Sequence, residues 1–283
     1  MTTTATTTSK DGTTISYTST GADSGPSGAA GNKPGVVIIS GNNRMAHNYE
    51  KLAANLADNF TVYVIERRGR GQSGPQGENY TLQSEIEDVQ AVLAATHSHN
   101  VFGHSYGGLI ALQAAAQMPD IQKVVAYEPT VSINGSFDLS WLPQFEAAYK
   151  SGKTVRATVI FLKLARLSMV STWPKPLLYI LATLLLSGKS GKEMRALMPT
   201  TPAEIRETAR ADSDGSIYHT ITANTLLLAG ENGAKPIIEI LPALKEIIPR
   251  AAYQLMPKLN HNSPDLGPVA GIAAAITNHF KQV

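Results

Sequence analysis

The alternation of short apolar runs with helical patterns constrains the fold of this chain more than any other feature. Four runs with the composition of buried strands precede residue 130, and segments with the apolar spacing of amphipathic helices separate them. Strands that alternate with helices form a parallel sheet covered by helices on both faces. The four strands are expected at residues 36–39, at 60–65, in the run that ends at 101–102, and at 124–127.

This alternation stops after Pro129 and returns near residue 223. The intervening segment contains several apolar helical stretches and no convincing strand pattern. Two more strands are expected at 225–228 and 251–256, and a threonine-rich hairpin at Asp11-Gly12 supplies the first two. The chain is therefore predicted to form a mostly parallel, twisted sheet of eight strands with helices on both faces. The predicted domains are a core, residues 1–131 and 223–283, and a helical lid inserted after the sixth strand, residues 132–222.

Composition and charge exclude several classes of protein. The 283 residues include no cysteine, which excludes a disulfide scaffold and cysteine-ligated metals, and the net charge of +2 comes without a basic stripe for nucleic acid. The longest apolar run, residues 177–186, is too short to span a bilayer, and the threonine-rich start of the sequence lacks the apolar segment of a secretion signal. A cytoplasmic protein without a membrane span is the expectation.

Residues 103–108 read Gly-His-Ser-Tyr-Gly-Gly, a G-x-S-x-G motif between an apolar run and an alanine-rich helical segment. Strand, tight turn and helix place Ser105 at the tip of the turn, with glycines where side chains would block it. A serine hydroxyl exposed at a helix N-terminus suits nucleophilic attack on an acyl group. The alternative is a glycine-rich turn with an idle serine, which the flanking pattern disfavours.

Four segments in this order resemble the α/β-hydrolase fold superfamily, and the resemblance covers nearly the whole chain. A Tyr-Glu-Pro sequence after the sixth strand is also found in a lidded, lipase- and esterase-like branch of that superfamily. The resemblance implies the α/β-hydrolase sheet and a serine nucleophile, with no cofactor and no metal. The segments are residues 40–43 (SGNN), 67–74 (RRGRGQSG), 103–108 (GHSYGG) and 260–262 (NHN).

The resemblance implies that Ser105 is the nucleophile and His261 the general base, because His261 follows the last strand where the family keeps its histidine. Of the other histidines, His104 is expected to point away from Ser105 and to serve packing. His279, in the final helix, is expected at the surface.

The acid is where the sequence departs from the family pattern, because Gly233 stands where the aspartate after the seventh strand is expected. Glu128, just after the sixth strand, is favoured as its substitute, and Glu231 in the usual loop is the alternative. Glu128 could instead cap its strand and order the lid hinge, or the site could lack an acid altogether. A site without an acid would make the protein a poor hydrolase or give it a different activity.

The backbone N–H groups of Tyr106 and Asn42 are the expected oxyanion hole, since Tyr106 begins the helix after the nucleophile. Asn42 and Asn43 could add a donor or contact the substrate, or could serve turn geometry only. Tyr106 and, in the lid, Phe161 and Trp173 are candidates for substrate contact, although packing within the lid is the commoner role for such aromatic residues. The arginines of residues 67–70 favour a structural turn over a phosphate site.

Three classes of function follow from these residues. The favoured one is a serine hydrolase that acts on an ester, thioester or lactone of a small hydrophobic substrate through an acyl-enzyme, with amides and peptides less favoured. The second keeps the fold and the Ser105–His261 pair for a lyase, cyclase, dehydratase or cofactor-free oxygenase. The third is a ligand-binding protein with a vestigial site.

Overall fold

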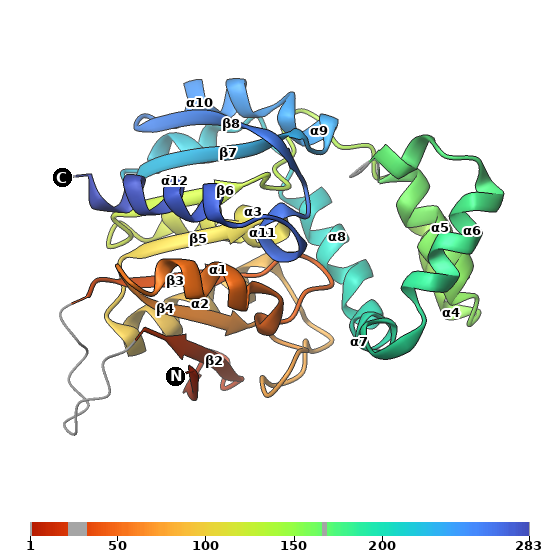
Figure 1. The fold of residues 1–283 in the computed structure, drawn as a ribbon, viewed down its shortest axis with the longest axis horizontal. Helices are drawn as coiled ribbons and strands as arrows, with labels where there is room; N and C mark the ends of the chain where they lie inside the picture. Colours follow the sequence, from red (N-terminus) through yellow and green to blue (C-terminus); the bar gives the residue numbers. More distant parts are fainter. Residues whose placement is uncertain (1, 22–32, 166–168, 283) are drawn as a thin grey trace.

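A computed structural model describes residues 2–21, 33–165 and 169–282 (Figure 1). Its centre is one eight-stranded sheet in the order β1-β2-β4-β3-β5-β6-β7-β8. The three strands from β1 to β4 along this order pair antiparallel, and all later neighbours pair parallel. The fold class predicted from the sequence is confirmed. The strands are β1 (Thr2–Thr8), β2 (Thr14–Thr20), β3 (Gly35–Ile39), β4 (Thr61–Glu66), β5 (Asn100–His104), β6 (Lys123–Tyr127), β7 (Asn224–Asn232) and β8 (Ala251–Asn260).

Alternate residues of the central strands bury their side chains on opposite faces of this sheet. Val36 and Ile38 of β3 pack with α1 (Glu50–Leu56) and α12 (Ala270–Lys281), as Figure 1 shows on one face. Val37 and Ile39 pack with the helices of the opposite face. Burial on both faces explains why these strands read as continuous apolar runs. The opposite face carries α2 (Leu82–Thr96), α3 (Tyr106–Gln117) and α10 (Leu241–Ile247).

Between β6 and β7, the described residues form five α-helices, and we call this part of the chain, residues 132–222, the helical insertion. Four of them lie beside the sheet with a small apolar core of their own around Trp141 and Phe145 (Figure 1). The fifth, α8, runs back between them and the sheet and contacts α2 and α3. The helices are α4 (Leu142–Lys150), α5 (Thr154–Leu164), α6 (Lys175–Leu185), α7 (Gly188–Leu197) and α8 (Thr201–Arg210).

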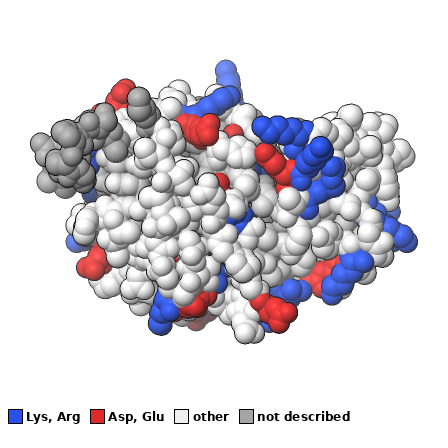
Figure 2. Space-filling view, turned by 90° about the horizontal axis from the view of Figure 1, so that it is seen from below, with Lys and Arg blue, Asp and Glu red and all other residues white. Residues whose placement is uncertain are grey.

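On the face shown in Figure 2, basic and acidic side chains are separated by wide uncharged areas. Within the described ranges, every helix is too short or too polar to cross a membrane.

Candidate active site

Ser105 lies in a strained turn between β5 and α3, which is the strand-turn-helix unit expected from its motif. Its backbone angles are φ 56° and ψ −120°, a region that residues other than glycine seldom adopt. Strain of this kind is stored where the surrounding structure fixes a functional side chain, and it defines the nucleophile elbow of this fold.

Three glycines make the turn at Ser105 sterically possible. A Cβ atom at Gly103 would lie 2.2 Å from the carbonyl oxygen of Gly107, and one at Gly107 would lie 2.2 Å from that of Ile39. A Cβ atom at Gly108 would lie 2.9 Å from the Cα atom of Pro129. Because these are backbone atoms in a close-packed interior, they cannot move aside for a side chain.

His261, in the loop that follows β8, contacts Ser105 and Glu128 with its two ring nitrogens. Its Nε2 lies 3.1 Å from Ser105 Oγ, and its Nδ1 lies 2.8 Å from Glu128 Oε2. A carboxylate only accepts hydrogen bonds, so the proton belongs on Nδ1 and leaves Nε2 free to accept the serine proton. His261 thus lies within hydrogen-bond distance of both Ser105 and Glu128, an arrangement that suits a nucleophile, a base and an orienting acid.

Glu128 is fully buried immediately after β6 and has a positive φ of 42°. Its Oε1 accepts a hydrogen bond from the Gly230 N–H at 2.9 Å, and its Oε2 accepts one from the Ala234 N–H at 3.0 Å. Burial alone would raise the pKa of this carboxyl. The hydrogen bonds from His261 and from the two backbone N–H groups outweigh burial and hold the pKa of Glu128 below its usual value.

The glycine at position 233 is explained by the same carboxylate. A Cβ atom at Gly233 would lie 1.9 Å from Glu128 Oε1, so no side chain fits there while Glu128 is present. The other candidate, Glu231, is exposed and accepts a hydrogen bond from the Lys258 N–H at 3.1 Å. The structure thus brings Glu128, and not Glu231, to His261.

His104 links two loops of the site in a way that the sequence did not reveal. Its Nε2 lies 2.8 Å from the His261 carbonyl oxygen, and its Nδ1 lies 2.7 Å from the Tyr49 hydroxyl, which also accepts from the Gly41 N–H at 3.0 Å. Since a carbonyl only accepts, Nε2 carries the proton and the Tyr49 hydroxyl donates to Nδ1. Burial, with the nearby His261 and Arg44, holds the pKa of His104 well below its usual value, so the ring stays neutral.

The two expected oxyanion donors come from two different segments next to Ser105. Tyr106 is the first residue of α3, where a backbone N–H has no partner within the helix. Asn42 follows Gly41 in the loop after β3 and lines both cavities at Ser105. Its Nδ2 donates to Glu204 Oε2 at 2.7 Å, so a buried residue of α8 fixes this loop. No local pattern marked Glu204, because its partners are more than 130 residues away in the sequence.

Two cavities meet at Ser105. The larger has a volume of about 360 Å³ and is lined by Asn43 and His261, among others. The smaller has a volume of about 60 Å³ and is lined by Tyr106. Phe161, which the sequence suggested as a candidate for substrate contact, lines both cavities.

A protein-family model described as the alpha/beta hydrolase fold matches residues 34–268 of this chain. The chain belongs to the α/β-hydrolase family. The solved structure of an alpha/beta hydrolase from Sphaerobacter thermophilus is 26% identical, with a TM-score of 0.80 over 98% of this chain and 100% of that one. The N-formylmaleamate deformylase of Pseudomonas putida is 34% identical over 102 residues, which are 34% of this chain and only 38% of the relative. The 2-(acetamidomethylene)succinate hydrolase of Mesorhizobium japonicum is 24% identical over 88% of each chain.

Two expectations for this α/β hydrolase do not agree with its structure. Trp173 was expected to contact the substrate, but it follows η2 (Met169–Thr172), its side chain is 42% exposed, and it is absent from the described residues that line either cavity. His279 was expected at the surface. It is buried instead, with Nε2 3.0 Å from the Asn224 carbonyl oxygen, because its face of α12 packs on the sheet.

The arginines of the α/β hydrolase at positions 67, 68 and 70 are buried ion-pair partners. Arg67 donates to Glu85 at 2.6 Å and Arg68 to Asp88 at 2.7 Å, while Arg70 pairs with Glu204. Their charges are therefore neutralised within the protein, as a structural turn requires.

Proposed function

We propose that this α/β hydrolase is a serine-dependent hydrolase of an ester, thioester or lactone of a small hydrophobic substrate. One observation carries the proposal: Ser105 Oγ, His261 and Glu128 form a continuous hydrogen-bonded chain at the floor of a cavity large enough for a ligand. His261 takes the Ser105 proton as the hydroxyl attacks the acyl carbon, and it later gives this proton to the leaving group. Water then hydrolyses the acyl-enzyme by the same path.

Three features support further parts of this proposal. The N–H groups of Tyr106 and Asn42 stabilise the oxyanion of the tetrahedral intermediate. The helical insertion acts as a lid, since helices α5 and α7 contribute walls to the larger cavity above Ser105. The carboxylate of Glu128 occupies the place of the missing aspartate, which removes the main reason for considering chemistry other than hydrolysis. Cytoplasmic location remains a proposal from the sequence.

A second candidate is hydrolysis of an amide in place of an ester. It is favoured by the names of two relatives, an N-formyl deformylase and an acetamido hydrolase, both of which designate compounds with acylated nitrogen. The same three residues serve this reaction, because His261 can protonate a leaving nitrogen as readily as a leaving oxygen.

The test compares the wild type with Ser105→Ala on panels of p-nitrophenyl esters and of anilides with the same acyl groups. We expect ester turnover and fluorophosphonate labelling in the wild type, and loss of both in the variant, with kcat lower by about 10³-fold or more. Turnover that persists in Ser105→Ala would contradict the serine mechanism. Ligand binding without turnover or labelling in the wild type would favour a vestigial site.

A further inference from the structure

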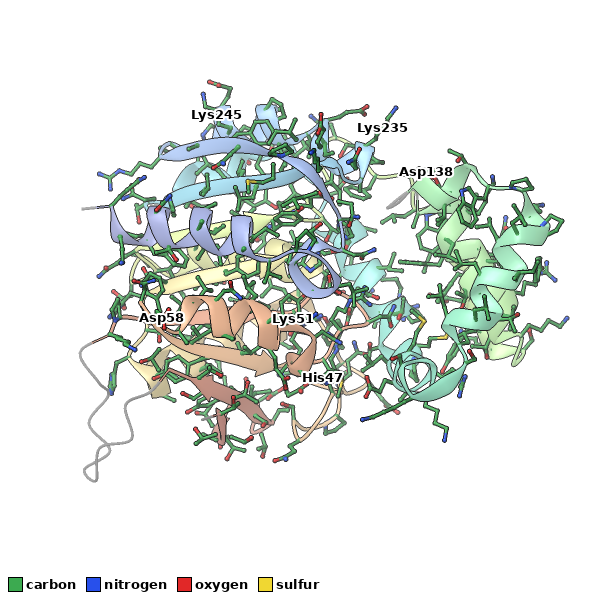
Figure 3. All side chains as sticks on the ribbon, viewed as in Figure 1. His47, Lys51, Asp58, Asp138, Lys235 and Lys245 are labelled. Atoms are coloured by element: carbon green, nitrogen blue, oxygen red, sulfur yellow. The ribbon has the colours of Figure 1, made fainter. Side chains whose placement is uncertain are left out.

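The two cavities at Ser105 differ in the catalytic group that they contain. His261 lines the larger cavity and is absent from the described lining of the smaller one. Tyr106 lines the smaller cavity only. In Figure 3 the labelled His47, which lines the larger cavity, and Asp138, which lines the smaller one, lie well apart.

The chemistry of acyl transfer assigns a role to each cavity. The leaving atom must receive its proton from His261 Nε2, so the leaving group extends on the side of that ring. The oxyanion points to the N–H groups of Tyr106 and Asn42. The remaining substituent of the acyl carbon must therefore extend away from His261. We propose that the smaller cavity binds the acyl group and the larger cavity binds the leaving group.

The size of the smaller cavity limits the acyl group. Its volume of about 60 Å³ is far below the roughly 300 Å³ or more of cavities that hold a whole ligand. Its walls are well fixed: Trp141 is 3% exposed, its Nε1 donates to the Asp138 carbonyl oxygen at 3.0 Å, and its ring meets that of Phe161 edge-on at 5.8 Å. Formyl, acetyl and propionyl groups suit this space, whereas longer chains collide with buried side chains.

The larger cavity imposes no such limit on the leaving group. It measures about 360 Å³, and polar side chains such as Arg44 and Asn262 lie in its lining beside apolar ones such as Leu197. The substrate class is thus a short-chain acyl group on a larger, mixed-polarity leaving group. This inference rests on the proposed serine hydrolase.

The reaction is a balanced two-step transfer. Ser105 Oγ first bonds to the acyl carbon to give the tetrahedral intermediate, and its proton passes to His261. The bond from that carbon to the leaving oxygen then breaks, and His261 gives the proton to that oxygen. Water then adds one proton to Ser105 Oγ and its hydroxyl to the acyl carbon, which releases a short carboxylic acid.

The experiment varies the acyl chain while the leaving group stays constant, using p-nitrophenyl acetate, propionate, butyrate and hexanoate. For the wild type we expect kcat/KM to fall by at least about tenfold from propionate to hexanoate, because each misfitting methylene in a tight pocket costs about tenfold or more. Mass spectrometry of the intact protein detects the acyl-enzyme where its hydrolysis is slow.

Three variants locate the effect in the smaller cavity. Ile205→Ala removes part of its wall and should move the preference toward butyrate and hexanoate, and Ala165→Leu should fill it and leave acetate the best substrate. Leu162→Ala, which enlarges only the other cavity, should keep the acyl-chain profile of the wild type.

Two results overturn the inference alone: equal or better turnover of hexanoate in the wild type, or a shift of the profile in Leu162→Ala but not in Ile205→Ala and Ala165→Leu. Failure of the proposed function has a different signature, since the wild type would then give neither turnover nor an acyl-enzyme with any ester, acetate included.

Discussion

At the scale of single residues, the position of the acid is determined by space as much as by charge. Glu128 and a side chain at position 233 would occupy the same volume, because a Cβ atom at Gly233 falls 1.9 Å from Glu128 Oε1. Strands β6 and β7 are neighbours in the parallel sheet, so the loops that follow them reach the same side of His261. A carboxylate from either loop can therefore orient this histidine, but not one from each.

An exchange of the acid between these two loops is a direct test. Glu128→Ala should lower kcat by up to about 10⁴, the cost of removing a triad acid, and Gly233→Asp alone should be inactive or unstable because of the collision. The double variant Glu128→Ala with Gly233→Asp should recover part of the lost activity, because the carboxylate introduced at position 233 enters the space that Glu128 leaves. Steady-state kinetics on an acetate ester measures all three.

The control for this exchange is Glu231→Gln, which removes the exposed carboxylate that bonds the Lys258 N–H. It should leave kcat within about twofold, as for surface substitutions distant from the reacting groups. A larger loss in Glu231→Gln than in Glu128→Ala would show that Glu231 provides the acid during turnover.

At the scale of elements, helix α8 connects the insertion to the oxyanion loop. Glu204 of α8 is fully buried, and its two carboxylate oxygens receive hydrogen bonds from Asn42, Arg67 and Arg70. One turn earlier, the Thr201 hydroxyl donates to Asn43 Oδ1 at 2.9 Å. The loop that carries a proposed oxyanion donor is thus held by the inserted helix as well as by the sheet.

Glu204→Gln should loosen this loop. The uncharged amide keeps only one acceptor oxygen, and where its N–H₂ faces Arg70, which only donates, that hydrogen bond is lost and the buried guanidinium loses its charged partner. We expect kcat to fall by about 10²-fold, as when an oxyanion donor is displaced, with a lower melting temperature. Kinetics and thermal unfolding measure the two effects separately.

Glu207→Gln, on the same helix, is the matched control. Glu207 Oε2 accepts from the Leu82 N–H at 2.8 Å and its Oε1 pairs with Arg210, so it fastens α8 to the core without touching the oxyanion loop. This variant should lose stability, by about 1–3 kcal/mol, with little change in kcat. Equal losses of kcat in both variants would mean that α8 acts only through general stability.

At the scale of the whole molecule, the sequence predicted the sheet because strand and helix patterns are local. The eight strands and the turn at Ser105 follow from apolar spacing and glycines, whereas the loop of His261 was predicted from the resemblance to the α/β-hydrolase superfamily. Contacts between distant segments could not be predicted from the sequence. Tyr49 forms a hydrogen bond with His104, 55 residues away, and Glu204 forms one with Asn42, 162 residues away. The exposure of Trp173 was not predictable either, because it depends on how the segment between η2 and α6 packs on the rest of the insertion.

The hydrogen bonds of His104 join three parts of the chain that are distant in sequence. They run from the Gly41 N–H through the Tyr49 hydroxyl to His104 and on to the His261 carbonyl oxygen. The arrangement suits a neutral ring, because Nδ1 then accepts the Tyr49 hydroxyl proton, whereas in a protonated ring Nδ1 would have to donate at this position. Stability of the folded chain is therefore linked to the protonation of this histidine.

Stability should fall as the pH drops below about 6.5. The pKa of His104 is held below its ordinary value of 6.5 in the folded state and returns to it on unfolding, so below that pH the unfolded chain binds more protons than the folded one. The loss is up to about 1.4 kcal/mol per pH unit for each such group, and the buried His279, whose pKa is also lowered, acts with the same sign. The lowered pKa of Glu128 also makes the folded chain less stable in acid, but only as the pH falls below 4.5, the ordinary pKa of a glutamate.

Urea unfolding at pH 7, 6 and 5 measures how the free energy of unfolding changes with pH. The variant His104→Gln isolates the part of this pH dependence that His104 contributes. Gln has one amide donor for the His261 carbonyl and one acceptor for Tyr49, but it does not titrate. The variant should therefore be less stable than the wild type at pH 7 because the ring packing is lost, yet should lose less stability between pH 7 and pH 5.

His279→Gln should reduce the pH dependence of stability independently, and the two reductions should add because the two histidines share no hydrogen-bond partner. A slope unchanged in His104→Gln would mean that the pKa of His104 is the same in the folded and the unfolded chain, and it would contradict the lowered pKa on which this prediction rests.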